Sequence, residues 1–220
     1  MFKLMWEKML IKLSAIKKDS NLTDFWRHRA RLYGKRSVLN MAHDEDQFDE
    51  VTDFQKSILF PLLKAELKGY ENIVLDFGCG PGRFTLGLAE LIRGNAVGVD
   101  ITPELLELAP KSFNVSYQCI GIGQLPFSGA SFDVVWSCLV LGGIPDEHIG
   151  QSIAEIERVL RPGGLFFYIE NTARLADTGY WFFRDEETYI RLAAFCKPKK
   201  LGEYDDLGQT ISIFSGRKSS

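Results

Sequence analysis

The chain has 220 residues, of which 45% are hydrophobic and 25% are charged, and its formal net charge is −3. This length and composition are typical of an ordinary globular protein with one domain and an attached segment. The small negative net charge gives no indication of a nucleic-acid partner, so we expect none.

The cysteines predict neither a metal site nor a disulfide framework. Cys79, Cys119, Cys138 and Cys196 are far apart in the sequence and form no C-x-x-C pair. No stretch approaches the roughly 18 consecutive apolar residues of a membrane-spanning helix. We therefore predict a reduced, cytoplasmic setting and no metal.

Residues 1–18 predict a basic amphipathic helix. Its apolar residues recur at steps of three or four, and they are Phe2, Met5, Trp6, Met9, Leu13 and Ile16. Such a helix can pack on its own domain, pack on a second copy in a homodimer, or make peripheral contact with an anionic membrane surface. We favour the packed arrangements over the membrane contact.

Residues 21–40 are rich in arginine and contain Trp26, Tyr33 and Arg36. One interpretation is a solvated basic helix that ends in a turn at Gly34. The other is that Trp26, Tyr33 and Arg36 help to close a ligand site in the following domain. Residues 54–67 then predict a helix that packs on a sheet, with Pro61 as a kink.

The stretch from Ile73 to Thr85 predicts a buried strand, a glycine-rich turn and a helix from about residue 82 to residue 92. Gly78, Gly80 and Gly82 allow positive φ angles and let a ligand approach the backbone closely. The dinucleotide fingerprint fails because Arg83 stands where its third glycine belongs, and the phosphate loop fails because no Gly-Lys-Ser/Thr follows. Asp76 would repel a phosphate, so the turn indicates a cationic ligand.

A second strand, residues 95–99, ends at Asp100 and completes a β-α-β unit. The carboxyl ends of the strands meet at the ligand crevice of a doubly wound sheet, where an acid can accept hydrogen bonds from both ribose hydroxyls. The alternative is that Asp100 caps the helix that begins near Thr102 and Pro103.

The second half of the chain continues the alternation of strands and helices. We predict strands at residues 114–120, 134–137 and 165–169, helices at 146–160 and 184–195, and two antiparallel strands within 199–218.

The run Asp-x-Gly-x-Gly-x-Gly at residues 76–82 resembles the first motif of class I S-adenosylmethionine (SAM) methyltransferases of the UbiE-like type. Leu125–Phe127, Phe132-Asp133 and Arg161–Gly164 also match that family. The resemblance implies an α/β fold, Rossmann-like and doubly wound, with a mostly parallel seven-stranded sheet of order 3-2-1-4-5-7-6. It also implies residues 1–53 as an N-terminal amphipathic helix and helical cap, and residues 54–220 as the SAM-binding domain.

The resemblance also implies how SAM is held. The family's acid for the adenine amino group is replaced by Gly121, so recognition falls to the backbone of residues 121–123 with Gln124, and Ile101 and Ile122 sandwich the ring. Arg36 pairs with the SAM carboxylate. The full set of expected cofactor residues is Trp26, Tyr33, Arg36, Asp76, Gly78, Gly80, Gly82, Asp100, Ile101, Gly121, Ile122, Gly123, Gln124, Ser137, Cys138 and Leu139.

Candidates for a general base are few. His43 lies in the cap segment and Glu170 ends a strand at the crevice edge, so either one is a catalytic candidate. The alternatives are a solvated loop histidine and a structural salt bridge. Arginines elsewhere can supply an anion grip for a phosphorylated acceptor, namely Arg27, Arg29, Arg31, Arg36, Arg174 and Arg184.

The run W-x6-Y-G-x-R-x-V-L-N at residues 26–40 resembles the cap of methyltransferases that accompany bacterial surface-polysaccharide synthesis. We therefore predict O-methylation of a small molecule: a sugar, a sugar phosphate or a surface-polysaccharide precursor. A lipid, a quinone or another small metabolite is the alternative acceptor. Gly121, Gly142 and Gly143 stand at three positions that often carry polar side chains in the family. They favour a second hypothesis, an inactive SAM-fold binding or scaffold subunit. Nicotinamide-dependent oxidoreduction is a third hypothesis.

Overall fold

The computed structural model describes residues 22–219, so the predicted amphipathic helix at residues 1–18 lies outside the described residues. The helical elements are α2 (Leu22–Tyr33), η1 (Gly34–Val38), α3 (Phe48–Glu66), α4 (Thr85–Ile92), α5 (Pro103–Leu106), η2 (Leu141–Gly143), α6 (Asp146–Val159), α7 (Glu186–Leu192) and η3 (Ala194–Cys196). The strands are β1 (Ile73–Phe77), β2 (Asn95–Asp100), β3 (Val115–Cys119), β4 (Phe132–Cys138), β5 (Leu160–Asn171), β6 (Lys199–Asp206) and β7 (Gln209–Arg217).

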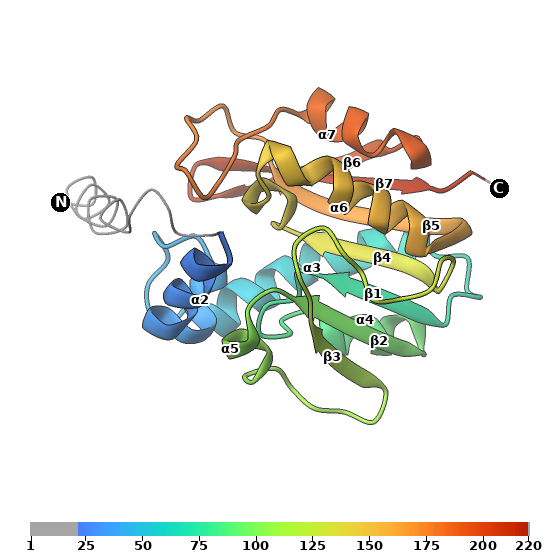
Figure 1. The fold of residues 1–220 in the computed structure, drawn as a ribbon, viewed down its shortest axis with the longest axis horizontal. Helices are drawn as coiled ribbons and strands as arrows, with labels where there is room; N and C mark the ends of the chain where they lie inside the picture. Colours follow the sequence, from blue (N-terminus) through green and yellow to red (C-terminus); the bar gives the residue numbers. More distant parts are fainter. Residues whose placement is uncertain (1–21, 220) are drawn as a thin grey trace.

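The strands form one seven-stranded sheet in the order β3-β2-β1-β4-β5-β7-β6 (Figure 1). The pairs from β3 to β5 are parallel, whereas β7 is antiparallel to both β5 and β6. The predicted fold class and strand order are therefore confirmed. The parallel strands bring their carboxyl ends to one edge of the sheet, where ligands bind in open α/β folds.

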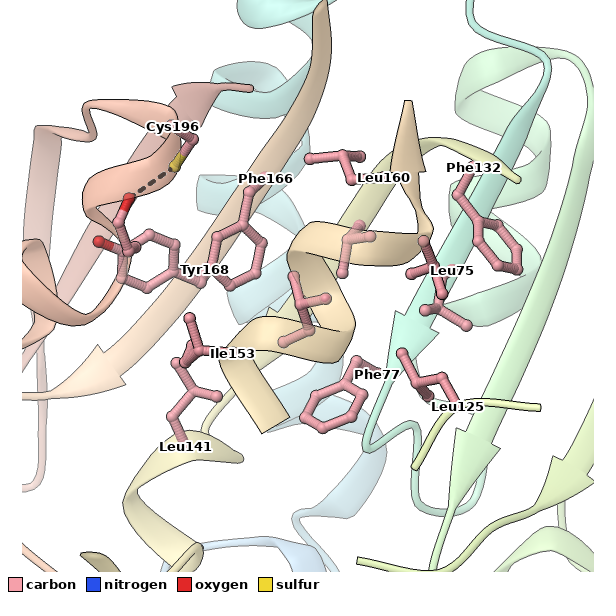
Figure 2. Packing of buried hydrophobic residues seen from close by; sticks show 14 of the residues in the cluster. Leu75, Phe77, Leu125, Phe132, Leu141, Ile153, Leu160, Phe166, Tyr168 and Cys196 are labelled. Carbon is pink, nitrogen blue, oxygen red and sulfur yellow. Dashed lines mark hydrogen bonds between the residues drawn. The ribbon is translucent and has the colours of Figure 1, made fainter. Parts of the chain in front are cut away.

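Helices cover both faces of the sheet because side chains alternate along each strand. In β5, Phe166 and Tyr168 pack with α6 and α7, and Phe167 packs with α3 and α4 on the opposite face. All three side chains are fully buried, as expected for a central strand covered on both sides. Figure 2 shows the α6 side, where Ile153 lies among side chains from the sheet.

Helix α3 begins six residues before the predicted start of residues 54–67, and Asp49 and Glu50 lie in its first turn. Acidic residues at that end are favourable for the helix dipole. The helix packs on the sheet through Leu59 and Leu63, as predicted, and continues through Pro61. The predicted division between residues 53 and 54 falls inside this helix.

Two other helices are shorter than predicted. Helix α4 begins at Thr85, because Gly82 has a φ of 74° that no right-handed helix accepts. Helix α7 covers only Glu186–Leu192, with Asp185 accepting the amide of Thr188 as its N-cap, and the rest of the predicted segment forms η3.

The N-terminal helix α2 lies beside α5 (Figure 1). Arg27 and Arg31 of α2 both pair with Glu104 of α5, at 3.1 and 2.7 Å. These contacts hold α2 at the strand-end edge of the sheet. Within residues 22–219, no helix is both long enough and apolar enough to cross a membrane.

Candidate functional site

The glycine turn after β1 is folded back onto the end of β2. The amides of Gly78 and Cys79 donate to the carbonyl of Val99, at 2.8 and 2.9 Å. The amide of Gly80 donates to Oδ2 of Asp100 at 2.9 Å, and the amide of Thr102 donates to Oδ1 at 2.8 Å. Asp100 therefore connects the glycine turn to the segment that leads into α5, whose N-cap residue is Thr102, and its contact with a ribose stays a prediction.

Glycine is required in this turn for steric as well as conformational reasons. Gly78 and Gly80 have φ angles of 71° and 53°. A Cβ on Gly78 would lie 2.4 Å from Val140, and one on Gly80 would lie 2.9 Å from Val38. The turn is a cradle in which backbone, not side chain, faces the space above β1.

Two buried carboxyl groups lie at this cradle. Asp76 is 2% exposed, and one of its oxygens accepts a hydrogen bond from the Thr85 hydroxyl at 2.6 Å. Burial raises the pKa of Asp76 to about 7, against the opposing effect of the Thr85 hydrogen bond. Burial also raises the pKa of Asp100.

One cavity of about 540 Å³ lies above the carboxyl ends of the strands and includes this cradle. Its volume is in the range of sites that enclose a cofactor or a small ligand. Its walls come from the turn after β1, the ends of β2 and β4, the segment 120–123, the N-terminal cap and the segment after β5.

Aromatic side chains close the cavity from above. Trp26 of α2, and Tyr180 and Trp181 after β5, line it. Tyr180 stacks on Phe25 of α2 with ring centroids 4.2 Å apart, so the cap and the segment after β5 hold each other.

Most of the predicted cofactor residues line this cavity. They are Trp26, Asp76, Gly78, Gly80, Asp100, Ile101, Gly121, Ile122, Gly123, Cys138 and Leu139.

Five predicted cofactor residues do not line the cavity: Tyr33, Arg36, Gly82, Gln124 and Ser137. Arg36 donates instead to the carbonyls of Met41 and His43, at 3.1 and 2.6 Å. Gly82 faces the other side of the turn, where a Cβ would meet the hydroxyl of Tyr117. The site roles of these residues stay predictions.

The two catalytic candidates lie behind the cavity wall. Glu170 is fully buried and accepts the amides of Val140, Leu141 and Gly142, at 3.0, 2.8 and 3.1 Å. Burial raises its pKa to about 7, opposed by these three bonds. In this geometry Glu170 holds the loop after β4.

His43 reaches the cavity only through another residue. Its Nε2 lies 2.6 Å from Oδ1 of Asp206, and the Asp206 side chain lines the cavity. Asp206 ends β6 and joins the site from the far edge of the sheet.

Three polar residues of the cavity had no predicted site role: Arg83, Asp206 and Gln209. In the sequence, Arg83 served only to exclude the dinucleotide and phosphate-loop motifs. Asp206 and Gln209 flank the turn of the β6–β7 hairpin, and Gln209 pairs with Asn171 at the end of β5. Their convergence depends on the register of β7 against β5 and β6, for which local sequence gives no signal.

The comparisons with known proteins find a methyltransferase domain in the central part of this chain. Residues 74–164 match the family described as "Methyltransferase domain". This match covers the glycine turn, Asp100 and the loop held by Glu170. The predicted enzyme class and the predicted cofactor, SAM, are thereby confirmed for the domain.

Curated relatives match part of this chain. The malonyl-[acyl-carrier protein] O-methyltransferase of Herminiimonas arsenicoxydans is 31% identical over 134 residues, which are 59% of this chain and 49% of the relative. The demethylmenaquinone methyltransferase of Chlorobaculum parvum is 31% identical over 101 residues, which are 46% of this chain and 41% of the relative. The chain thus spans less than half the length of these relatives.

Solved structures show the same fold at low identity. The PH0226 protein of Pyrococcus horikoshii matches with a TM-score of 0.66 and 20% identity, over 87% of this chain and 99% of that one. Phosphoethanolamine N-methyltransferase 2 of Haemonchus contortus, solved in complex with SAM, matches with a TM-score of 0.69 and 15% identity, over 93% and 61%. The names of these relatives refer to different substrates, so none of them assigns the acceptor of this chain.

Proposed function

We propose that this protein transfers a methyl group from SAM to an oxygen of a small-molecule acceptor. The observation that carries the proposal is the cavity, whose lining runs from the glycine cradle to a region with Arg83, Asp206 and Gln209, which we call the acceptor compartment. A shared enclosed space holds two reactants in a fixed relative geometry and so lowers the barrier of a displacement reaction.

The cradle fits SAM by its own chemistry. Gly78 and Gly80 line the cavity, where their backbone can be approached closely by the methionine part, and Asp100 offers carboxylate oxygens at the strand end for the ribose hydroxyls. Bound there, SAM supplies an electrophilic methyl group on a sulfonium. The buried carboxyl groups of Asp76 and Asp100 favour a cation in this part of the cavity.

Asp206 is the group best placed to accept the proton of an acceptor hydroxyl. Its Oδ1 is held by His43, and its other oxygen makes no hydrogen bond to protein within residues 22–219. His43 thus orients the carboxylate that faces the acceptor, rather than meeting the acceptor itself. A positioned base of this kind contributes roughly 100-fold or more to a rate.

The structure explains why residues 142 and 143 are glycines, and the explanation does not require a loss of activity. A Cβ on Gly142 would lie 2.7 Å from the Trp181 ring, and one on Gly143 would lie 3.2 Å from Trp26. The indoles of Trp181 and Trp26 occupy the space that larger side chains at these two positions would fill. Glycine therefore allows the loop after β4 to pack against both indoles. This geometry favours the enzyme over the inactive scaffold.

We further propose a sugar, sugar phosphate or surface-polysaccharide precursor as the acceptor. The support is the cap sequence at residues 26–40, whose Trp26 lines the cavity.

The test is direct. Isothermal titration should detect binding of SAM and of its demethylated product, and a panel of hydroxylated sugars, sugar phosphates, quinols and acids should be scored for S-adenosylhomocysteine release. Binding with turnover on one acceptor class supports the proposal. Failure to bind either nucleoside at millimolar concentration would refute it, and turnover only on amines or thiols would refute the oxygen acceptor.

A further inference from the structure

Arg83, the residue directly after the glycine turn, lines the same cavity. Its charge is affected by Cys138 at the end of β4, by Tyr204 and Asp206 of β6, and by Asp76 of the glycine cradle. Strand β6 is at the opposite edge of the sheet from β2 and β3. Arg83 therefore lies near Asp76 and on the β6 side of the cavity, in the acceptor compartment.

The guanidinium is held from one side by two fixed acceptors on α3. Nε donates to Oγ1 of Thr52 at 3.1 Å, and Nη2 donates to Oε1 of Gln55. The Thr52 hydroxyl donates its hydrogen bond to the carbonyl of Phe48, and the Gln55 amide nitrogen donates to the Tyr204 hydroxyl. Both acceptors are thus oriented toward Arg83, and the guanidinium cannot turn freely.

This attachment leaves a defined set of donors for a ligand. A guanidinium has five N–H groups, and Thr52 and Gln55 engage one on Nε and one on Nη2. Both hydrogens of Nη1 and one of Nη2 make no hydrogen bond to protein in the described part of the chain. A carboxylate or phosphate binds such a pair of adjacent nitrogens with two parallel hydrogen bonds.

The carboxylates of Asp206 and Asp76 act on the charge of Arg83 but form no ion pair with it. Within residues 22–219, no carboxylate oxygen lies within 4.0 Å of its nitrogens. Its partners are neutral oxygens and the ring of Phe84, 4.9 Å from the guanidinium carbon. Burial lowers the pKa of Arg83, which is the effect of a charge that lacks sufficient compensation.

Five of the six arginines expected to grip an anion are engaged elsewhere. Arg27 and Arg31 pair with Glu104, Arg184 pairs with Asp146, and Arg36 donates to two backbone carbonyls. Arg29, which also lines the cavity, donates to the carbonyls of Ser37 and Leu39 and thereby shapes the cap. The sixth, Arg174, does not line the cavity. Arg83 differs from these because it lines the cavity with free donors and no ion pair among the described residues.

We infer that Arg83 is the specificity-determining residue for the acceptor, and that the acceptor carries an oxyanion, a carboxylate or a phosphate, which Arg83 binds through two parallel hydrogen bonds. This inference rests on the proposed function and adds the substrate class: a small acid or phosphorylated hydroxyl compound. A neutral acceptor would leave the guanidinium buried and unpaired, so the site discriminates against it.

The experiment uses matched probes on the full chain saturated with S-adenosylhomocysteine. Benzoate and phenyl phosphate carry the oxyanion, and benzamide is the neutral compound of similar shape. In the unchanged protein we expect at least one anion to bind 10-fold or more tightly than benzamide by isothermal titration. Arg83→Met should remove that difference and leave the benzamide affinity unchanged, and Arg83→Lys should restore part of it.

Two controls separate the possible failures. Arg93→Met changes an exposed arginine at the C-terminal end of α4 and should leave all affinities unchanged. SAM affinity should stay within about threefold in Arg83→Met. Equal binding of anions and benzamide, or a loss of SAM affinity in Arg83→Met, overturns the inference alone, whereas failure of the unchanged protein to bind S-adenosylhomocysteine overturns the proposed function.

Discussion

Nε2 of His43 lies 2.6 Å from Oδ1 of Asp206, a contact between residues 163 positions apart in the sequence. It joins the loop before α3 to the end of β6, and so connects the N-terminal cap to the far edge of the sheet. Both side chains are mostly buried, with 13% and 10% of their surface exposed. A short, shielded bond of this kind fixes the direction of the carboxylate.

The first prediction follows from that direction. Asp206→Asn removes the proton acceptor and should lower kcat about 100-fold, with SAM affinity unchanged, whereas His43→Ala only loosens the carboxylate and should lower kcat about 10-fold. Single-turnover rates of S-adenosylhomocysteine release measure both. Glu203→Gln, on the exposed side of the same strand, is the matched control and should keep the full rate. A rate within twofold for Asp206→Asn would exclude Asp206 as the base.

The second prediction concerns the glycine cradle. In Gly80→Ala the new Cβ meets Val38 at 2.9 Å on a backbone with a φ of 53°, so the turn must shift away from Asp100. We expect SAM affinity to fall at least 10-fold by isothermal titration. Gly150→Ala, on the exposed surface of α6 with open space around it, should leave affinity unchanged and raise stability by about 0.5 to 1 kcal/mol. Equal affinities for the two variants would contradict a steric role for Gly80.

The contrast between Asp100 and Asp206 explains how much of the site the sequence could predict. Asp100 ends β2, the next strand after the glycine turn and α4, and neighbouring parallel strands end at the same edge. Asp206 reaches that edge only because β6 runs antiparallel to β7, which pairs in turn with β5. Local periodicity predicted the strands well, but not which of their end residues would meet.

Arg83 and Glu170 show a second limit. The sequence places each correctly, one after the turn and the other at a strand end, but not the groups that engage it. Thr52 and Gln55 come from α3, and the amides that occupy Glu170 come from the loop after β4. A side chain's chemistry depends on such partners, which are distant in sequence.

The third prediction distinguishes the two roles proposed for Glu170. If it mainly holds the loop after β4, Glu170→Ala leaves three amides without their acceptor and should lower the free energy of unfolding by about 3 kcal/mol. Glu170→Gln keeps one acceptor oxygen and should cost less. Urea unfolding measures both. A 100-fold loss of kcat in Glu170→Gln with unchanged stability would instead support the general-base role.

The fourth prediction is a pH dependence at Asp76. Its folded-state pKa of about 7 exceeds the ordinary value of 3.8. At a pH between these two values, Asp76 is protonated in the folded state and ionised in the unfolded state. The contribution of Asp76 to stability is therefore fully present below about pH 4 and is lost as the pH rises through 7. An asparagine side chain does not ionise, so Asp76→Asn does not lose stability in this way. The free energy of unfolding of Asp76→Asn minus that of the unchanged protein should therefore rise between pH 4 and 8, by on the order of 4 kcal/mol.

The measurement for Asp76 is denaturant unfolding of both proteins across that pH range without SAM, because a bound cation would favour the charged carboxylate. Asp177→Asn, at an exposed carboxylate in the segment after β5, is the control and should follow the unchanged protein. A difference between Asp76→Asn and the unchanged protein that stays constant with pH would contradict the raised pKa.

The fifth prediction concerns the loop after β4 and the indole of Trp181 that lies on it. A Cβ on Gly142 would approach the Trp181 ring to 2.7 Å, and the amide of Phe182 donates to the Gly142 carbonyl at 2.7 Å. The loop after β4 and the segment after β5 therefore cannot separate freely. Gly142→Ala should displace the indole, shift tryptophan fluorescence toward exposed emission and raise the acceptor KM at least fivefold, with little change in SAM affinity. Trp181→Ala should raise KM similarly, and the double variant should be no worse than Trp181→Ala, because the added methyl group then meets no ring. Additive effects of the two substitutions would show that Gly142 acts through some other contact.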